Sequence, residues 1–140
     1  MIIKGSDGST EWEFSNREGL RRRDGSESFI ITIRELGLKA SQSVYAWDPR
    51  GESLPDFFTE LAKNWRGWEG KRKWNSFEGE FELVCSHDRI VHIAIEMTLK
   101  SPGSWTVQSS LNAVAGELDN IAKEITIFFD VEHSPKPIVG

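Results

Sequence analysis

Apolar and polar residues alternate with a period of two through the middle of this chain, and no other feature constrains the fold as strongly. Odd-numbered positions, apart from Gly79 and Ser109, carry apolar side chains in the runs 77–85, 91–99 and 105–113. The turn-forming segments His87-Asp88-Arg89 and Ser101-Pro102-Gly103 separate these runs. Because side chains of a strand point alternately to its two faces, each run predicts a strand with one buried face. Together they predict an antiparallel meander.

Two other segments repeat apolar residues at helical spacing. The first has Ser53 as its N-cap and Pro55 in its first turn, and its apolar positions continue to Trp65. The second runs from Leu118 to Phe129. Since each helix has one apolar stripe, we expect an α+β fold in which both helices pack on one face of the antiparallel sheet. The opposite, polar face of the sheet is then free.

The remaining segments give shorter signals. Residues 1–27 predict one short strand near residues 10–14, and residues 29–47 predict a β-hairpin. Residues 68–75 are expected to form a connection. The tail, residues 131–140, contains two prolines and is expected to be irregular.

Length and composition limit the class of protein. The length of 140 residues fits a single domain, 1–140, and 38% hydrophobic with 28% charged residues predicts a packed core. The net charge of -5 disfavours nucleic-acid binding. Cys85 is the lone cysteine, and no apolar run reaches the roughly 20 residues that span a bilayer. We therefore expect a cytoplasmic protein without a disulfide, a secretory leader or a membrane anchor.

The free face of the predicted sheet carries the first candidate site. Tight turns between strands that share a buried face place Glu80 opposite Glu96, and Glu96 opposite Gln108. Glu82 and His92 lie on the same face. Like charges directly opposed destabilise a sheet unless something neutralises them, and a lysine, an arginine or solvent is the simplest explanation. The alternative is a carboxylate pair that acts as acid and base, or binds a divalent cation with His92.

Residues 65–74 interleave tryptophans with basic residues, a combination that can stack on bases or sugars and pair with phosphates. Trp65 falls on the apolar stripe of the first helix and Trp74 adjoins a strand, so both are expected in the core. Trp68 is then the surface candidate, together with Arg66. A structural role, a protein-binding surface, and nucleic-acid or glycan binding all stay open for this segment.

Motifs of familiar catalytic chemistry do not occur in the sequence, which has no Gly-rich phosphate loop, nucleophile elbow or zincin helix. The histidines and Cys85 lack the spacing of a transition-metal site, and Cys85 falls on the core face of its strand. His87 and Asp88 lie in a turn, where an Asp side chain commonly bonds to the backbone. We therefore predict no catalytic residue, metal or cofactor.

A set of residues between about 50 and 130 forms a recognisable pattern. It consists of Trp65-Arg66-Gly67-Trp68, Gly70, Trp74, Ser76, Glu78-Gly79-Glu80, His87-Asp88, His92, Leu99, Trp105, Ala115-Gly116-Glu117-Leu118 and Phe128-Phe129. This pattern resembles an uncharacterised bacterial family of small soluble proteins, described as a domain of unknown function. The resemblance implies no activity, cofactor or partner.

The leading functional hypothesis is a non-enzymatic binding module with a protein partner. It would act through the acidic free face or the connection that contains Trp68. The alternative is a small carboxylate- or metal-assisted hydrolase on the polar face of the sheet, built on Glu80, Glu82, His92 and Glu96. The third hypothesis is nucleic-acid binding through Arg66, Trp68, Lys71, Arg72 and Lys73.

Overall fold

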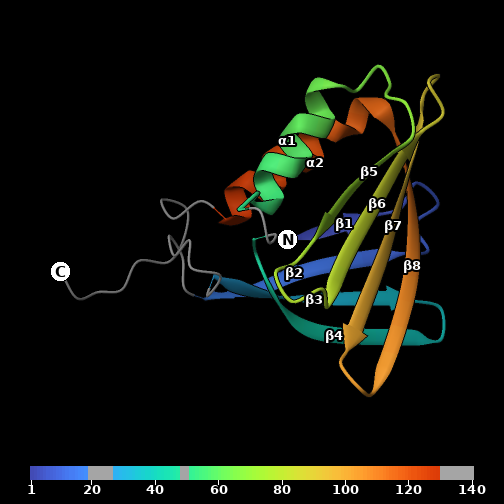
Figure 1. The fold of residues 1–140 in the computed structure, drawn as a ribbon. Coiled ribbons are helices and arrows are strands. Elements are labelled where there is room, and N and C mark those ends of the chain that lie inside the picture. The colour runs from blue at the N-terminus through green and yellow to red at the C-terminus, as the bar shows by residue number, and fades with distance from the viewer. Residues whose placement is uncertain (19–26, 48–50, 130–140) are drawn as a thin grey trace.

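The computed structural model describes residues 1–18, 27–47 and 51–129 of the 140-residue chain. This described part contains two four-stranded antiparallel sheets and two α-helices, and the order of four strands followed by one α-helix occurs twice (Figure 1). The α+β class predicted from the sequence is confirmed. Neither helix is both long and apolar enough to cross a bilayer. The predicted irregular tail, 131–140, lies outside the described residues.

The C-terminal sheet contains the predicted meander. Its strands pair in the order β5 (Lys71–Asn75), β6 (Phe81–His87), β7 (His92–Ser101) and β8 (Trp105–Val114). All buried positions of β6 and β7 are odd-numbered, which confirms the alternation.

Two boundaries of this sheet differ from the prediction. β6 begins at Phe81 rather than at Phe77, because Gly79 N donates to Ser76 O at 2.9 Å and closes a tight turn before the strand. Residues 71–75, predicted as part of a connection, form the edge strand β5. The edge position suits its charged side chains, while its Trp74 packs into the core.

The N-terminal sheet consists of β1 (Ile2–Lys4), β2 (Glu11–Glu18), β3 (Ser28–Glu35) and β4 (Leu38–Tyr45), paired in sequence order. The predicted hairpin corresponds to β3 and β4. The sequence did not reveal β1 or that these strands form a sheet of their own. The eight residues of β2 carry only two apolar side chains, so their alternation is too short to stand out.

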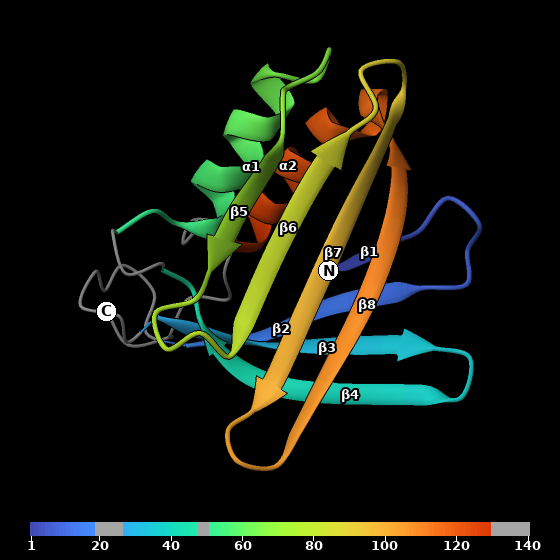
Figure 2. The same ribbon diagram turned by 45° about the vertical axis from the view of Figure 1, so that its right-hand side comes forward.

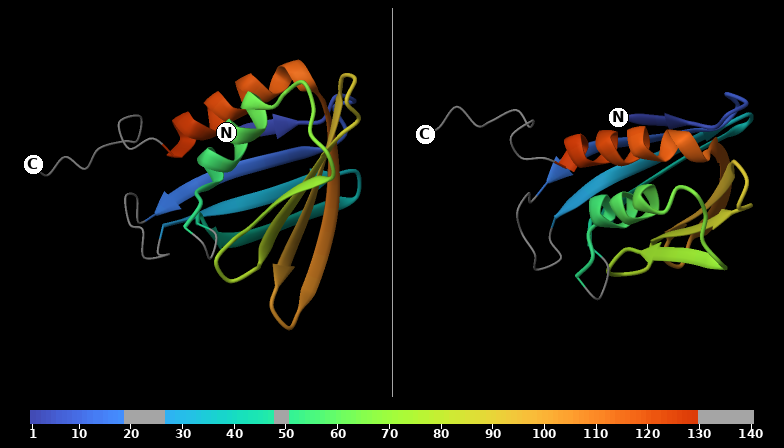
Figure 3. Two further views of the ribbon diagram at one scale, coloured as in Figure 1. Left: turned by 45° about the horizontal axis from the view of Figure 1, so that its top comes forward. Right: turned by 90° about the horizontal axis from the view of Figure 1, so that it is seen from above.

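The helices α1 (Leu54–Lys63) and α2 (Leu118–Phe129) lie side by side, and a 3₁₀ turn, Ala115–Glu117, precedes α2 (Figure 3). Ser53 caps α1 as predicted, since Asp56 N donates to Ser53 Oγ at 3.2 Å. Both helices pack on the face of the C-terminal sheet that carries the odd-numbered residues, and the predicted arrangement is confirmed.

One hydrophobic core is shared by both sheets and both helices. The strands of the N-terminal sheet run across those of the C-terminal sheet, and the helices fill the space beside them (Figure 2). The ring of Phe29 on β3 lies 5.4 Å from that of Phe14 and 6.1 Å from that of Phe81, measured between centroids. The N-terminal sheet therefore covers part of the apolar face that the sequence assigned to the helices alone.

Hydrogen bonds between polar groups join the two sheets at several points. Trp12 Nε1 donates to Ser109 Oγ at 2.9 Å, and the Ser109 hydroxyl donates to Glu35 Oε1 at 2.5 Å. At another point, Tyr45 N on β4 donates to Glu80 Oε1 at 3.0 Å. Because buried polar groups cost free energy when left unpaired, these bonds fix how the two sheets meet.

Candidate functional site

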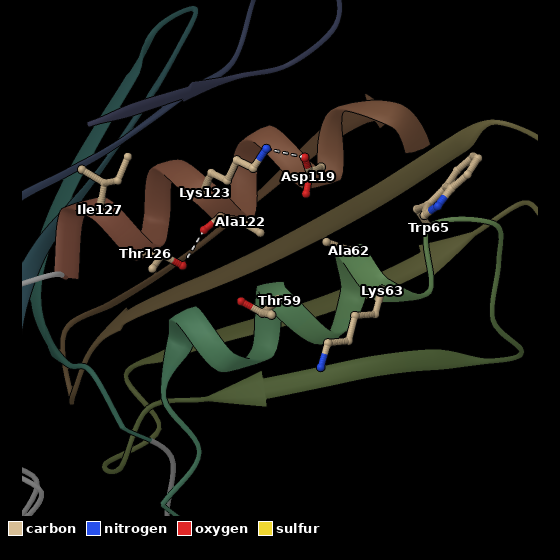
Figure 4. A pocket seen from close by; sticks show the side chains of 9 residues that line it. All are labelled: Thr59, Ala62, Lys63, Trp65, Asp119, Ala122, Lys123, Thr126 and Ile127. Carbon is tan, nitrogen blue, oxygen red and sulfur yellow. Dashed lines mark hydrogen bonds and ion pairs between the residues drawn. The ribbon is translucent and has the colours of Figure 1, made fainter.

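An open groove lies between α1 and α2, with a volume of about 640 Å³ (Figure 4). The facing residues are short, with Thr59 and Ala62 on α1 and Ala122 and Thr126 on α2. Thr126 Oγ1 donates to Ala122 O at 2.8 Å, so the hydroxyl is paired within its own helix. The volume is within the range of typical ligand-binding pockets, and the floor is mainly apolar.

Charged side chains border this groove. Lys123 pairs with Asp119 at 2.8 Å, one turn apart on α2, and the hydrogen bond with Asp119 raises the pKa of Lys123. Lys63 adds a positive charge on α1, and Arg66 follows shortly after the helix. The border of the groove is therefore positive on balance, in a chain whose net charge is -5.

Trp65 lies at one end of the groove, where 46% of its surface is exposed (Figure 4). The prediction that Trp65 belongs to the core was wrong, because α1 ends at Lys63 with Asn64 as C-cap and the helical stripe does not reach residue 65. The guanidinium carbon of Arg66 lies 5.2 Å from the centroid of the Trp65 ring. An exposed indole and a stacked guanidinium thus stand together beside an apolar groove.

His87 holds the backbone of Trp65 in place. The His87 side chain is 0% exposed, and its Nε2 lies 2.7 Å from Trp65 O. Arg89 N donates to His87 Nδ1 at 2.6 Å, so Nδ1 is the acceptor and Nε2 carries the proton that binds the Trp65 carbonyl. Two segments of the sequence pattern, Trp65-Arg66-Gly67-Trp68 and His87-Asp88, therefore meet at one end of the helix pair.

Trp68, predicted as a surface residue, is only 5% exposed, which corrects that prediction. Gly67 has a φ of +141°, a conformation that favours glycine, and it turns the chain back toward the sheet. There Trp68 Nε1 donates to Cys85 O at 3.3 Å, and its ring lies 5.1 Å from that of His87. Cys85 is buried as predicted, and burial raises the pKa of its thiol to about 12.

Asp88 organises the turn between β6 and β7. Its Oδ1 accepts hydrogen bonds from the backbone N–H groups of Ile90, Val91 and His92, at 2.8, 2.9 and 3.0 Å. His92 Nδ1 lies 3.0 Å from Asp88 Oδ2. The predicted turn role of Asp88 is confirmed, and His92, a predicted binding residue, is exposed but paired within this turn.

Replacing Asp88 with Asn should make the free energy of unfolding depend less on pH in the acid range. The N–H group of Ile90, followed by that of His92, lowers the pKa of the Asp88 carboxyl below its ordinary value of 3.8. The stability that this depressed pKa contributes is present above pH 3.8 and is lost as the pH falls through the lower pKa of the folded protein. Urea denaturation at pH 7 and below pH 3.8 measures the difference, and Asp119→Asn, which alters an exposed carboxylate, is the control.

The predicted pairing of Glu80 with Glu96 was wrong. In the structure Glu96 lies opposite Val84 on β6 and opposite Ser110 on β8, rather than opposite Glu80 and Gln108. The turn between β6 and β7 spans residues 88–91, so its centre lies further along the chain than the predicted centre at Asp88. The faces of the strands are as predicted, but the partners across them are displaced.

Glu80 is also absent from the polar face. It lies just before β6 with 6% of its surface exposed, and its Oε1 accepts the hydrogen bond from Tyr45 N. Its Oε2 is buried and has no hydrogen-bond partner among the described residues. The Glu80 carboxylate therefore bonds to the end of β4 and is not part of a surface site.

The outer face of the C-terminal sheet still brings several predicted residues together. Glu82 lies opposite Thr98, and Thr98 lies opposite Gln108, so these three form one row across β6, β7 and β8. Glu96 is the diagonal neighbour of Glu82 on this face. Within residues 1–18, 27–47 and 51–129, no three His, Cys, Asp or Glu side chains form a group that could hold a metal.

This geometry defines an α+β protein that presents a groove between two helices, with an exposed tryptophan at one end. The chain belongs to the Family of unknown function (DUF6228), whose model matches residues 3–132. The match extends beyond the resemblance noted for residues 50–130 and includes the N-terminal sheet. Searches of curated proteins and of solved structures gave no match.

Proposed function

We propose that this chain is a non-enzymatic binding module that docks a segment of a partner protein in the groove between α1 and α2. The observation that carries the proposal is the position of Trp65, whose indole is exposed at the end of the groove while His87 fixes its carbonyl. We expect the partner to be a cytoplasmic protein.

Trp65 has the properties of an anchor residue in an interface. Tryptophan and arginine dominate the binding energy of protein interfaces, because they bury a large area in a well-packed pocket. The Trp65 backbone is already ordered by its bond to His87, and Arg66 lies against the ring. Less conformational freedom is therefore lost when a partner covers the indole.

The proposed occupant is a short amphipathic helix with acidic residues. α1 has 10 residues and α2 has 12, so each helix is about 15 to 18 Å long at 1.5 Å per residue. A partner helix of about three turns could lie along both and place apolar residues on the floor of the groove. Acidic residues beside that apolar stripe would complement Lys63 and Arg66.

Affinity capture from a native lysate tests this proposal. We expect the natural chain to retain one protein in stoichiometric amount, and Trp65→Ala to retain much less of it, because losing a 2 kcal/mol interface contribution raises the dissociation constant about thirtyfold. The control is Leu36→Ala, which removes another exposed apolar side chain, at the turn between β3 and β4. Equal retention by both variants would contradict the role of the groove.

No described contact favours the alternative functions over this one. The hydrolase hypothesis required Glu80 to face Glu96, and Glu80 instead bonds to Tyr45 N inside the fold. The nucleic-acid hypothesis required Trp68 to stack on a base, and Trp68 is buried.

A further inference from the structure

The edge strand β8 differs from the rest of the chain in charge. No charged residue occurs between Lys100 and Glu117, although 28% of the whole chain is charged. This uncharged stretch contains all of β8, the last strand of the C-terminal sheet. Proteins usually protect an exposed edge with charge, shortness or a covering segment, because its unpaired backbone groups can bond to another chain.

The other sheet edges of the described residues have such protection. β5 places Lys71, Arg72 and Lys73 in succession on the opposite edge of the same sheet. In the N-terminal sheet, β1 has only three residues, and β4 carries the charge of Lys39 and bonds at its end through Tyr45 N to Glu80. With ten residues, β8 is the longest of the four edge strands in the described residues, and it is the one that carries no charged side chain.

Hydrogen bonds at the end of β8 identify which of its backbone groups face outward. Ala115 N donates to Val91 O at 2.6 Å, so odd-numbered residues bond toward β7. Because the bonding direction alternates along a strand, even-numbered residues turn toward the open edge. Asn112 O indeed accepts from Ser6 N at 2.9 Å, and Val114 N donates to Glu117 Oε1 at 3.4 Å.

Three residues of β8 therefore keep their outward backbone groups available. They are Thr106, Gln108 and Ser110, for which no bond on the edge side is recorded among the described residues. Their side chains are exposed on the outer face of the sheet and are all uncharged. A strand paired there would extend the C-terminal sheet.

We propose that β8 pairs in antiparallel fashion with β8 of a second copy of this chain, about a twofold axis at Gln108. Each Gln108 then lies opposite its counterpart, and Thr106 of one copy lies opposite Ser110 of the other. Such an interface brings each residue close to its own kind, so any charge in the strand would meet a like charge. The absence of charge in β8 fits a second copy better than a different protein, which could gain from complementary charges.

Sedimentation velocity of the full chain over a range of concentrations tests the pairing. We expect the natural chain to approach twice its mass of 15.9 kDa as its concentration rises. Gln108→Lys should remain a single chain at the same concentrations, because two lysines would face each other across the axis. Thr98→Lys is the matched control, since it adds the same charge on the same face, opposite Gln108 but inside the sheet.

A dimer that persists in Gln108→Lys, or is lost equally in Thr98→Lys, would overturn the proposal, as would a natural chain that stays monomeric.

Amide hydrogen exchange provides a second readout that needs no variant. Under the proposal, the amide of Gln108 becomes protected as the concentration of the natural chain rises. Exchange at Gln108 that does not depend on concentration would contradict the pairing even if dimers form.

Discussion

Alanine in place of Phe81 is expected to lower the free energy of unfolding by about 3 to 5 kcal/mol, the range for a buried phenylalanine. Phe81 is fully buried where the sheets meet, and its ring centroid lies 5.8 Å from that of Trp74 and 6.1 Å from that of Phe29. The substitution removes both edge-on ring contacts and leaves a cavity between the sheets. Equilibrium denaturation in urea measures the loss.

The next residue along β6 provides the control. Glu82 lies on the outer face opposite Thr98, so Glu82→Ala should change the free energy of unfolding by no more than about 1 kcal/mol. Similar losses in the two variants would contradict the assignment of alternate residues to buried and exposed faces.

The two tryptophans of the Trp65-Arg66-Gly67-Trp68 segment should respond in opposite ways to substitution. Trp68→Ala is expected to cost about 3 to 5 kcal/mol of stability, because it removes a buried ring together with the hydrogen bond from its Nε1 to Cys85 O. Trp65→Ala should cost no more than about 1 kcal/mol, since 46% of the Trp65 surface is exposed to solvent.

Thermal and urea denaturation of both variants would measure this contrast. A large loss of stability in Trp65→Ala would mean that its indole supports the fold, as the helical spacing of the sequence first suggested. A small loss means that a binding defect of the same variant can be assigned to the groove itself.

The elements that the sequence predicted well are those with local signals. The alternation in β6 and β7 could be predicted because every second residue of each strand is buried. The start of α1 could be predicted from Ser53 and Pro55 alone. Each of these features is decided within a few residues of chain. The faces of the strands and the position of both helices on the odd-numbered side followed from them.

The features that the sequence did not predict depend on distant parts of the chain. The register of β6 against β7 was displaced because the Asp88 side chain builds a turn through residue 91, which spacing alone does not reveal. Glu80 is buried because Tyr45, far away in sequence, supplies a hydrogen bond. Trp65 and Trp68 exchanged their expected positions because α1 ends early and Gly67 reverses the chain.

Site-specific photocrosslinking tests groove binding most directly. A photoreactive phenylalanine analogue at Thr59, on the floor of the groove, should form a covalent adduct with the same protein that the natural chain captures. The analogue at exposed Leu36 should give no such adduct, and Trp65→Ala combined with the Thr59 probe should lose it. Adducts of that protein at Leu36 and not at Thr59 would contradict binding in the groove between α1 and α2.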